Sequence, residues 1–249
     1  MNNFHVIIPA RLASVRLPGK VLLEIAGKPL IQHVYERAVL CGAESITIAV
    51  DDERVKSVAE GFGAKVCMTA IEHMTGSDRL SEVVQKLQIP DEDIVVNVQG
   101  DEPHLTISAI QSVVQAMTAF PSAGMTTLCT KMHHPDEVMD PNVVKVVFDK
   151  NGFALYFSRS PIPCDRDQID VTSQDYFRHI GLYAYRAKTL KQYGAWKQPG
   201  IEQIEKLEQL RALWNGIKIH VTLVEEALPK GIDTEADLIR FRTLLERSC

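Results

Sequence analysis

Short apolar segments alternate with helical patterns through the first half of the chain. The predominantly apolar segments cover residues 4–8, 45–50, 65–68 and 94–98. Between them, apolar residues recur at helical spacing over residues 29–39, 53–62, 75–87 and 107–120. Strands of this kind are typical of parallel sheets whose faces are covered by helices, with right-handed crossovers between the strands. The pattern therefore predicts an α/β fold with a mostly parallel sheet.

In the second half of the chain, predicted strands follow one another with little helix between them. Strands are expected over residues 124–131, 143–149, 153–158, 177–186 and 217–224, and helices over 202–214 and 235–245. Asn151-Gly152 separates two of these strands and is a strong β-hairpin signal, which predicts an antiparallel addition and a mixed sheet. No repeat, low-complexity tract or linker interrupts the chain, so we expect a single domain over residues 1–249.

Composition and charge limit the classes of function. The formal net charge of −5 argues against a general binder of nucleic acids or anionic membranes, because both partners need a basic face. No run reaches the roughly 18 apolar residues of a membrane span, and no signal peptide is recognisable. The five cysteines are odd in number and form no C-x-x-C pair, which suits a reducing cytosol. We therefore expect a cytoplasmic protein.

A cationic loop follows the first apolar segment. Residues 8–20 read Ile-Pro-Ala-Arg-Leu-Ala-Ser-Val-Arg-Leu-Pro-Gly-Lys, with the cations Arg11, Arg16 and Lys20 and no acidic residue. Gly19 permits close approach of the backbone, and Arg and Lys supply charge to phosphate groups, so the loop could hold a polyphosphate. The alternative is a solvated basic surface loop. Neither the Walker pattern nor the dinucleotide-binding pattern is present, and spacing alone leaves both interpretations open.

Two other strand ends carry polar residues that suit helix capping. Thr75 or Ser77 can cap the helix that begins there, although a helix N-terminus beside Arg79 can also bind an anion or a ribose. Asp51 and Asp52 follow the second strand and could bind a metal ion. For this pair, a cap on the next helix is the favoured interpretation.

Two widely separated aspartates are candidate metal ligands. Asp101 follows the fourth apolar strand, and ligands of open α/β sheets bind at the carboxyl ends of strands, so we expect Asp101 near the cationic loop. Asp233 precedes the last helix. Mg²⁺ typically takes one or two carboxylates together with phosphate oxygens and water. The alternatives are a turn residue before Pro103 for Asp101 and a helix cap before Glu235 for Asp233.

Three motifs together resemble one enzyme family. Residues 8–20 fit I-P-A-R-x-x-S-x-R-L-P-G-K, residues 98–103 read Val-Gln-Gly-Asp-Glu-Pro, and residues 231–234 read Gly-Ile-Asp-Thr. This combination resembles the sugar-activating cytidylyltransferases, in the branch that makes CMP-Kdo from CTP and 3-deoxy-D-manno-octulosonate (Kdo). The resemblance implies a Rossmann-like nucleotidyltransferase fold and transfer of CMP from CTP to the anomeric hydroxyl of Kdo, with release of pyrophosphate, for lipopolysaccharide biosynthesis. It also implies Mg²⁺, a homodimer, and a sugar-binding and dimerisation lobe near residues 135–200.

The resemblance further implies roles for individual residues. The nucleotide-binding candidates are Ala10, Arg11, Leu12, Ser14, Arg16, Lys20, Thr75, Gly76 and Ser77. The sugar-binding candidates are Arg79, Gln99, Arg159, His179, Tyr183, Glu208 and Gln209. The metal ligands are expected to be Asp101 and Asp233, and the catalytic group is expected to be Arg11, Lys20, Asp101 and Asp233. No covalent enzyme intermediate is expected.

Three other functions compete with this interpretation. The nearest is a cytidylyltransferase for another acidic sugar such as sialic acid, which shares the basic loop; Gln99-Gly-Asp-Glu-Pro103 and the short chain favour Kdo. The second is a glycosyltransferase that uses a ready-made sugar nucleotide, which usually shows a D-x-D motif. The third is a nucleotide-binding regulator, which would have no reason to keep both Asp101 and Asp233.

Overall fold

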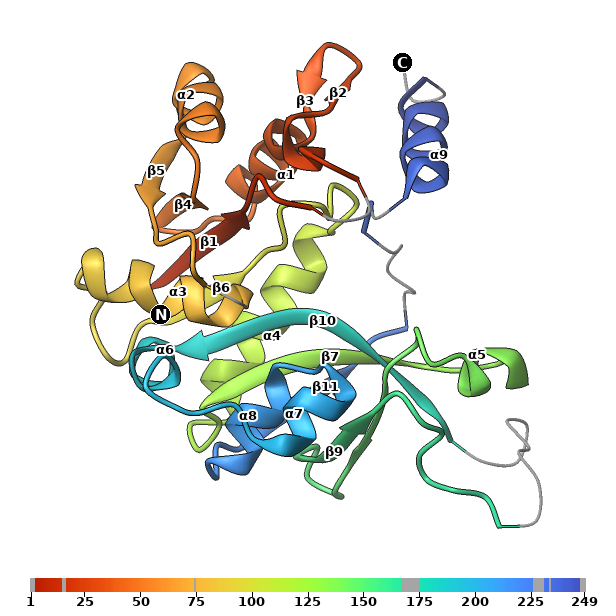
Figure 1. Cartoon of the computed structure of the whole chain (residues 1–249). Helices are drawn as coiled ribbons and strands as arrows, with labels where there is room; N and C mark the ends of the chain where they lie inside the picture. Colours follow the sequence, from red (N-terminus) through yellow and green to blue (C-terminus); the bar gives the residue numbers. More distant parts are fainter. Residues whose placement is uncertain are drawn as a thin grey trace.

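A nine-stranded mixed sheet runs through the described part of the chain (Figure 1). The computed structural model describes residues 3–14, 17–73, 75–166, 175–225, 231–232 and 234–246, without the side chains of residues 245 and 246. The main path of the sheet has the strand order β11-β7-β10-β6-β1-β4-β5, and the β8–β9 hairpin is attached through β10. The strands are β1 (Phe4–Ala10), β4 (Ser45–Val50), β5 (Lys65–Met68), β6 (Ile94–Asn97), β7 (Met125–Lys131), β8 (Lys145–Phe148), β9 (Ala154–Ser158), β10 (Phe177–Arg186) and β11 (Ile219–Leu223).

Helices cover both faces of this sheet. They are α1 (Leu30–Val39), α2 (Glu53–Gly61), α3 (Gly76–Lys86), α4 (Ile107–Ala119), α5 (Pro135–Met139), α6 (Ala187–Tyr193), α7 (Gly200–Glu205), α8 (Gln209–Trp214) and α9 (Glu235–Glu246). Residues of α1, α2 and α4 share one buried cluster with the strands, and residues of α3, α6 and α8 share the other. The predicted α/β class is therefore confirmed: a mostly parallel central sheet lies between two helical layers.

The parallel half of the sheet brings two loops together. Strand β1 lies between β4 and β6 and is parallel to both, with Val6 beside Ile46 and Val96. Because the carboxyl ends of parallel strands meet at one edge, the loops after β1 and β6 are neighbours. Gly100 makes this approach possible, since a Cβ there would lie 2.8 Å from the Pro9 carbonyl oxygen. This edge carries the site described below.

The antiparallel addition lies in the second half, as predicted. Strand β10 is inserted between β6 and β7 and is antiparallel to both, with a shift in register against β7 between Ile180 and Tyr183. The β8–β9 hairpin turns at Gly152, whose φ of +83° favours glycine. A Cβ at Gly152 would also approach His220 Nε2 to 2.7 Å. The Asn151-Gly152 signal is thus confirmed.

The C-terminal helix α9 has a small core of its own. Ile232, Leu238 and Phe241 pack against Ile25 and Leu30. The Phe241 ring also meets the ring of His33 from α1, with centroids 5.6 Å apart. This cluster fixes the end of the chain beside α1, next to the edge of the sheet that holds the loop after β1 (Figure 1).

Several elements differ from the prediction. The helix expected over 202–214 is two helices, α7 and α8, because Lys206 has a left-handed φ of 54° that ends α7. The sequence patterns did not predict the short helices α5 and α6, the turn of 3-10 helix at Lys20–Leu22, or the small hairpin of β2 (Glu24–Ile25) and β3 (Lys28–Pro29). These pieces are too short to show a clear periodicity.

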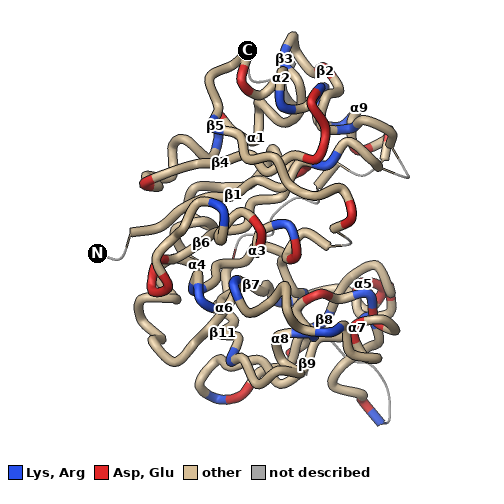
Figure 2. The backbone as a smooth tube through the Cα atoms, turned by 60° about the vertical axis from the view of Figure 1, so that its left-hand side comes forward, with Lys and Arg blue, Asp and Glu red and all other residues tan. Residues whose placement is uncertain are grey.

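Charged residues of both signs are spread along the described part of the chain. In the view of Figure 2, segments with basic residues and segments with acidic residues are interspersed. Among the described helices, none has the length and apolar composition needed to cross a membrane. The described cysteines are free thiols: Cys41, Cys67 and Cys129 are buried and Cys164 is exposed. Cys249 lies outside the described residues.

Candidate functional site

Two adjoining cavities open at the carboxyl edge of the parallel strands. The smaller has a volume of about 270 Å³ and is lined by the loop after β1, the start of α3 and the loop after β6. The larger has a volume of about 1250 Å³ and is lined by β10, the segment 140–144, the start of α8 and part of α9. Gln99 and Glu208 line both cavities, so the two spaces share a wall.

The smaller cavity brings the cationic loop to Asp101. The Lys20 ammonium donates to Asp101 Oδ2 and lies 3.4 Å from the carbonyl oxygen of Ile232. Arg11 and Ser14 line the same cavity. The expectation that Asp101 lies beside the cationic loop is confirmed. Arg16, the third predicted cation of the loop, lies outside the described residues.

The two aspartates after β4 have separate roles. Asp52 caps α2 by accepting a hydrogen bond of 2.8 Å from the Arg54 backbone N–H, as predicted. Asp51 instead accepts from the backbone N–H of Leu12 at 3.1 Å and from the Arg79 guanidinium at 2.8 Å. Asp51 therefore joins the cationic loop to Arg79 and holds the loop in place.

Arg79, a predicted sugar-binding residue, lines the smaller cavity, and its side chain is 3% exposed. Its guanidinium donates to Asp51 and to the Thr69 hydroxyl. A buried arginine with a carboxylate partner is expensive to separate from it, so Arg79 also braces the cationic loop through Asp51.

The N-terminus of α3 is occupied by the carboxylate of Glu208, the residue that precedes α8. Thr75 is the N-cap and accepts from the Asp78 N–H, which confirms the capping prediction. Glu208 accepts from the backbone N–H groups of Gly76 at 3.3 Å and Ser77 at 3.1 Å, and from the Ser77 hydroxyl at 2.8 Å. A helix N-terminus favours such an anion. Glu208 thus ties the wall of one cavity to the wall of the other.

A buried arginine reinforces the same junction. Arg211 donates to both carboxylate oxygens of Glu202, at 2.8 and 2.7 Å, and to Asp78 in the first turn of α3 at 2.7 Å. Its guanidinium lies 4.7 Å from the centre of the Tyr193 ring. The pKa of Arg211 is raised by these carboxylate partners against the opposing effect of burial. The charge at this position is therefore permanent, and α3 is fixed to α7 and α8.

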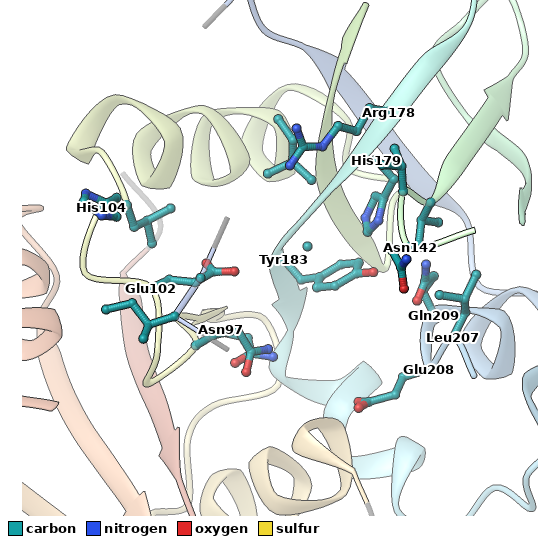
Figure 3. A pocket seen from close by; sticks show the side chains of 18 of the residues that line it. Asn97, Glu102, His104, Asn142, Arg178, His179, Tyr183, Leu207, Glu208 and Gln209 are labelled. Atoms are coloured by element: carbon teal, nitrogen blue, oxygen red, sulfur yellow. The ribbon is translucent and has the colours of Figure 1, made fainter. Parts of the chain in front are cut away.

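Aromatic and amide side chains surround the larger cavity (Figure 3). The rings of His179 and Tyr183 lie 5.4 Å apart on β10. The Thr127 hydroxyl donates to the Leu182 carbonyl, and it lies 3.0 Å from His179 Nε2, which can donate to it. Burial, and secondarily Arg178, lower the pKa of His179 to about 3, so the ring is neutral at physiological pH. Burial raises the pKa of Tyr183, which stays protonated.

Two cations hold the rim of the larger cavity through backbone carbonyls. Arg159 donates from Nε to the Glu205 carbonyl at 2.7 Å and from Nη1 to the Pro141 carbonyl at 2.9 Å. The fully buried Lys145 ammonium donates to the carbonyls of Asp140, Val143 and Arg159. Burial lowers the pKa of Lys145. The guanidinium of Arg159 thus joins two segments of the rim before any ligand binds.

Asp101 is the predicted metal ligand that lies among the described residues. Among the described residues, no group of three or more His, Cys, Asp or Glu side chains is arranged to hold a metal ion. Asp101 lies in the smaller cavity, and its carbonyl accepts from the Ile232 N–H at 2.8 Å. Asp233 lies outside the described residues. The cap of α9 is supplied by Thr234, whose hydroxyl accepts from the Asp237 N–H at 3.2 Å.

Most of the predicted site residues line one of the two cavities. The smaller is lined by Arg11, Ser14, Lys20, Thr75, Gly76, Arg79 and Asp101, together with Gln99 and Glu208. The larger is lined by Ser77, Gln99, Arg159, His179, Tyr183, Glu208 and Gln209. Ala10 and Leu12 line neither: Ala10 is buried at the end of β1, and Leu12 contributes its backbone N–H to Asp51.

Four residues at or around the larger cavity were not predicted from the sequence: Asn97, Lys145, Arg178 and Arg211. Asn97 and Arg178 line the larger cavity, and Lys145 and Arg211 hold its walls. Asn97 could have been found from its place at the end of a buried strand, two residues before Gln99. Arg211 carries no local signal, because its partner Asp78 lies 133 residues away in the sequence. Lys145 binds nearby backbone carbonyls, which no residue pattern announces.

Comparison with known proteins points to one family. A family model described as Cytidylyltransferase matches residues 5–219. A 3-deoxy-manno-octulosonate cytidylyltransferase of Pasteurella multocida (strain Pm70) is 49% identical over 259 aligned residues, which cover 99% of this chain and 100% of the relative. A protein of the same name from Haemophilus influenzae (strain 86-028NP) is 51% identical, with 98% of each chain covered.

Solved structures agree with the sequence comparisons. A structure of CMP:2-keto-3-deoxy-manno-octonic acid synthetase complexed with CTP matches with a TM-score of 0.91 and 42% identity, covering 99% of this chain and 100% of the other. A structure of 4-diphosphocytidyl-2C-methyl-D-erythritol synthase has a TM-score of 0.66 at 13% identity and supports the fold alone. The family model and these full-length relatives show that the chain belongs to the cytidylyltransferase family.

Proposed function

We propose that this chain transfers CMP from CTP to the anomeric hydroxyl of Kdo, giving CMP-Kdo and pyrophosphate, and so activates Kdo for lipopolysaccharide biosynthesis. One observation carries the proposal: a small cavity with Arg11, Lys20 and Asp101 adjoins a large polar cavity, and they share the wall of Gln99 and Glu208. Relatives that are about half identical over their full length carry the name of this activity.

The smaller cavity suits the nucleotide. Arg11 and Lys20 supply fixed positive charge for the triphosphate, and charge-assisted hydrogen bonds to phosphate are among the strong ones. During transfer, negative charge builds on the departing pyrophosphate, and fixed cations stabilise it without reorganisation. Lys20 is already held by Asp101 and by the Ile232 carbonyl, so its ammonium is oriented before the nucleotide binds.

The larger cavity suits a polyhydroxylated sugar acid. Its wall combines amides, a neutral imidazole, a phenol and a carboxylate in Gln209, His179, Tyr183 and Glu208. Such groups give both donors and acceptors for hydroxyls. Arg159 and Arg178 line the same cavity and supply positive charge for a carboxylate.

The reaction needs no covalent enzyme intermediate. The oxygen of the anomeric hydroxyl forms a bond to the α-phosphorus of CTP, while the bond from that phosphorus to the bridging oxygen of pyrophosphate breaks. The hydroxyl proton is released, and pyrophosphate leaves with the bridging oxygen and the electron pair. The enzyme's part is to align the two substrates across the wall of Gln99 and Glu208 and to neutralise charge.

We further propose that Mg²⁺ takes part, held by Asp101 and Asp233. The Asp101 carboxylate fits such an ion: it is a hard oxygen ligand inside the proposed triphosphate cavity, and Mg²⁺ commonly binds through one or two carboxylates and phosphate oxygens. When bound, the ion would neutralise charge on the triphosphate and acidify the attacking hydroxyl. The segment 231–232 lies against Asp101, with a Cβ at Gly231 reaching within 3.2 Å of the Asp101 carbonyl oxygen.

We also propose that the chain forms a homodimer in the cytoplasm. The region 135–200 exposes large apolar side chains at Met139 and Leu155, which are 59% and 64% exposed. Exposed apolar surface of this kind often marks a protein interface. Light scattering after size-exclusion chromatography would give twice the chain mass of 27.8 kDa for a dimer.

Pyrophosphate release tests the proposed reaction. The purified chain is incubated with Mg²⁺, each of the four nucleoside triphosphates, and a panel of acidic sugars that includes Kdo and sialic acid. We expect release only with CTP, and fastest with Kdo. Preference for sialic acid would assign a different cytidylyltransferase, and no release with any pair would reject the function.

A further inference from the structure

Asn97 is the last residue of β6 and faces the larger cavity. Its side chain is 2% exposed, and it lines the same cavity as Tyr183, Glu208 and Gln209 (Figure 3). Within the described part of the chain, Asn97 Oδ1 is buried and makes no hydrogen bond. Buried polar atoms of native proteins almost always have partners, so an orphan acceptor on a cavity wall requires an explanation.

A chain of hydroxyl groups fixes which way the Asn97 amide points. The Glu208 carboxylate can only accept, and the Ser77 hydroxyl donates a hydrogen bond to it at 2.8 Å. The Ser77 oxygen can then accept from the Tyr185 hydroxyl, which lies 3.5 Å away. Burial raises the pKa of Tyr185, which keeps its proton. The Asn97 amide acts on the Tyr185 hydroxyl as a hydrogen-bond partner that lowers its pKa, which fits an amide N–H directed at the phenol oxygen. Asn97 Nδ2 is therefore directed at Tyr185, and Asn97 Oδ1 is left as a hydrogen-bond acceptor for another group.

A matching donor lies on the same cavity wall. Gln209 is 5% exposed, and its Nε2 is buried without a hydrogen bond in the described residues. A hydroxyl group donates one hydrogen bond and accepts others, so it complements an orphan amide oxygen and an orphan amide nitrogen. A carboxylate would leave Asn97 Oδ1 unsatisfied, because a carboxylate cannot donate.

We propose that Asn97 Oδ1 accepts a hydrogen bond from a hydroxyl of the sugar and that the Glu208–Ser77–Tyr185 chain orients it for this role. The inference rests on the proposed function, since it places the sugar in the larger cavity. Asn97 is then a specificity residue: it selects a sugar that presents a hydroxyl at this point. A sugar that lacks this hydroxyl leaves the acceptor buried and unpaired, a loss that hydrogen-bonding sites discriminate against strongly.

Calorimetric titration of Kdo onto the purified protein tests this directly. We expect Asn97→Ala to weaken sugar binding roughly 3- to 30-fold and to leave CTP binding within about twofold of wild type, as for the loss of one hydrogen bond. Tyr185→Phe keeps Asn97 but removes its orienting partner, and it should weaken sugar binding by a smaller factor. Asn215→Ala, at an exposed position after α8, is the matched control and should change neither titration.

A series of monodeoxy Kdo analogues identifies the hydroxyl. One analogue should bind wild type as weakly as Kdo binds Asn97→Ala, and this analogue should bind both proteins equally. Unchanged sugar binding in both folded variants, Asn97→Ala and Tyr185→Phe, would overturn the inference, as would equal losses for every analogue. Wild type that binds Kdo but releases no pyrophosphate would reject the proposed function alone, and wild type that binds no Kdo would reject both.

Discussion

The two cavities are built in different ways. The smaller is made from segments that directly follow parallel strands: the loop after β1, the loop after β6, and the start of α3. The larger shares the loop after β6 but is otherwise assembled from β10, the 140–144 segment, α8 and α9, which are far apart in the sequence. The first kind of site is determined by sheet topology, because strand ends must meet at one edge. The second kind depends also on tertiary contacts such as that of Arg211 with Asp78.

This difference makes the effects of mutations separable. Changes in the smaller cavity should act on CTP and on the chemical step, whereas changes in the larger cavity should act on the sugar. Glu208 and Gln99 belong to both walls, so substitutions there should affect both substrates.

The largest expected effect is the loss of the Asp101 carboxylate. Asp101→Asn keeps the shape of the side chain but replaces a strong ligand for a hard cation with a neutral one, so turnover should fall about 1000-fold, on the scale of a Lewis-acid contribution. Steady-state turnover across a Mg²⁺ titration measures this. Asp91→Asn is the control, since Asp91 is exposed and pairs with Lys191. Near-normal turnover of folded Asp101→Asn would contradict the metal assignment.

Asp233→Asn sharpens the same test. Thr234 supplies the cap of α9, so the variant should melt within a few degrees of wild type. Turnover should nevertheless fall heavily if Asp233 holds Mg²⁺. A large loss of thermal stability with little loss of turnover would favour a structural role for Asp233.

Removal of the Lys20 ammonium should have the next largest effect. Lys20→Ala removes a charge-assisted contact to the triphosphate worth about 1.5–3 kcal/mol, which corresponds to roughly a 10- to 100-fold loss in kcat/KM for CTP. Initial-rate kinetics with varied CTP check this result. Lys28→Ala removes a half-exposed lysine that pairs with Glu36 outside both cavities and is the matched control. Equal kinetics of the two variants would remove the basis for the phosphate-binding loop.

Arg159 tests whether the larger cavity acts on the sugar alone. Arg159→Lys keeps the charge but cannot reproduce both hydrogen bonds to the Glu205 and Pro141 carbonyls. The KM for Kdo should rise roughly 10-fold, with the KM for CTP almost unchanged. Arg54→Lys, at an exposed position on α2, is the control. Equal changes in both KM values would show that the cavities are not functionally separate.

The smallest expected effect concerns His179 and pH. The folded protein lowers the pKa of His179 to about 3, whereas the unfolded chain has its ordinary value near 6.5. The unfolded state therefore binds the proton first, and stability is lost as the pH falls from 6.5 toward 3. Because the half-buried ring still meets solvent, we expect the loss in the free energy of unfolding at pH 5 to be about 1 kcal/mol. Melting curves of His179→Gln should show a flatter pH dependence between pH 5 and 7; an unchanged slope would contradict the assignment.

The sequence predicted those parts of the molecule that depend on local pattern. The apolar segment predicts strand β6. Because ligands bind at the carboxyl ends of parallel strands, it also predicts that Asp101, just after β6, lies beside the cationic loop, where it contacts Lys20. The break at Lys206 was not predictable, because a left-handed lysine has no sequence signature.

Long-range partners account for the contacts of the site that the sequence does not show. Nothing near Arg79 in the sequence shows that Asp51, 28 residues away, binds its guanidinium. Arg211 and Asp78 are 133 residues apart, and only the folded chain brings them together. The orphan oxygen of Asn97 likewise becomes visible only when every neighbouring donor has been placed.

The most direct test of the account is the ³¹P NMR spectrum of the purified chain with CTP, Kdo and Mg²⁺. If the smaller cavity holds the triphosphate and the larger holds the sugar acid, attack at the α-phosphorus converts the three CTP resonances into one phosphodiester resonance and pyrophosphate. This change should require Kdo. Formation of CDP, or of CMP and pyrophosphate without Kdo, would contradict transfer of CMP between the two cavities.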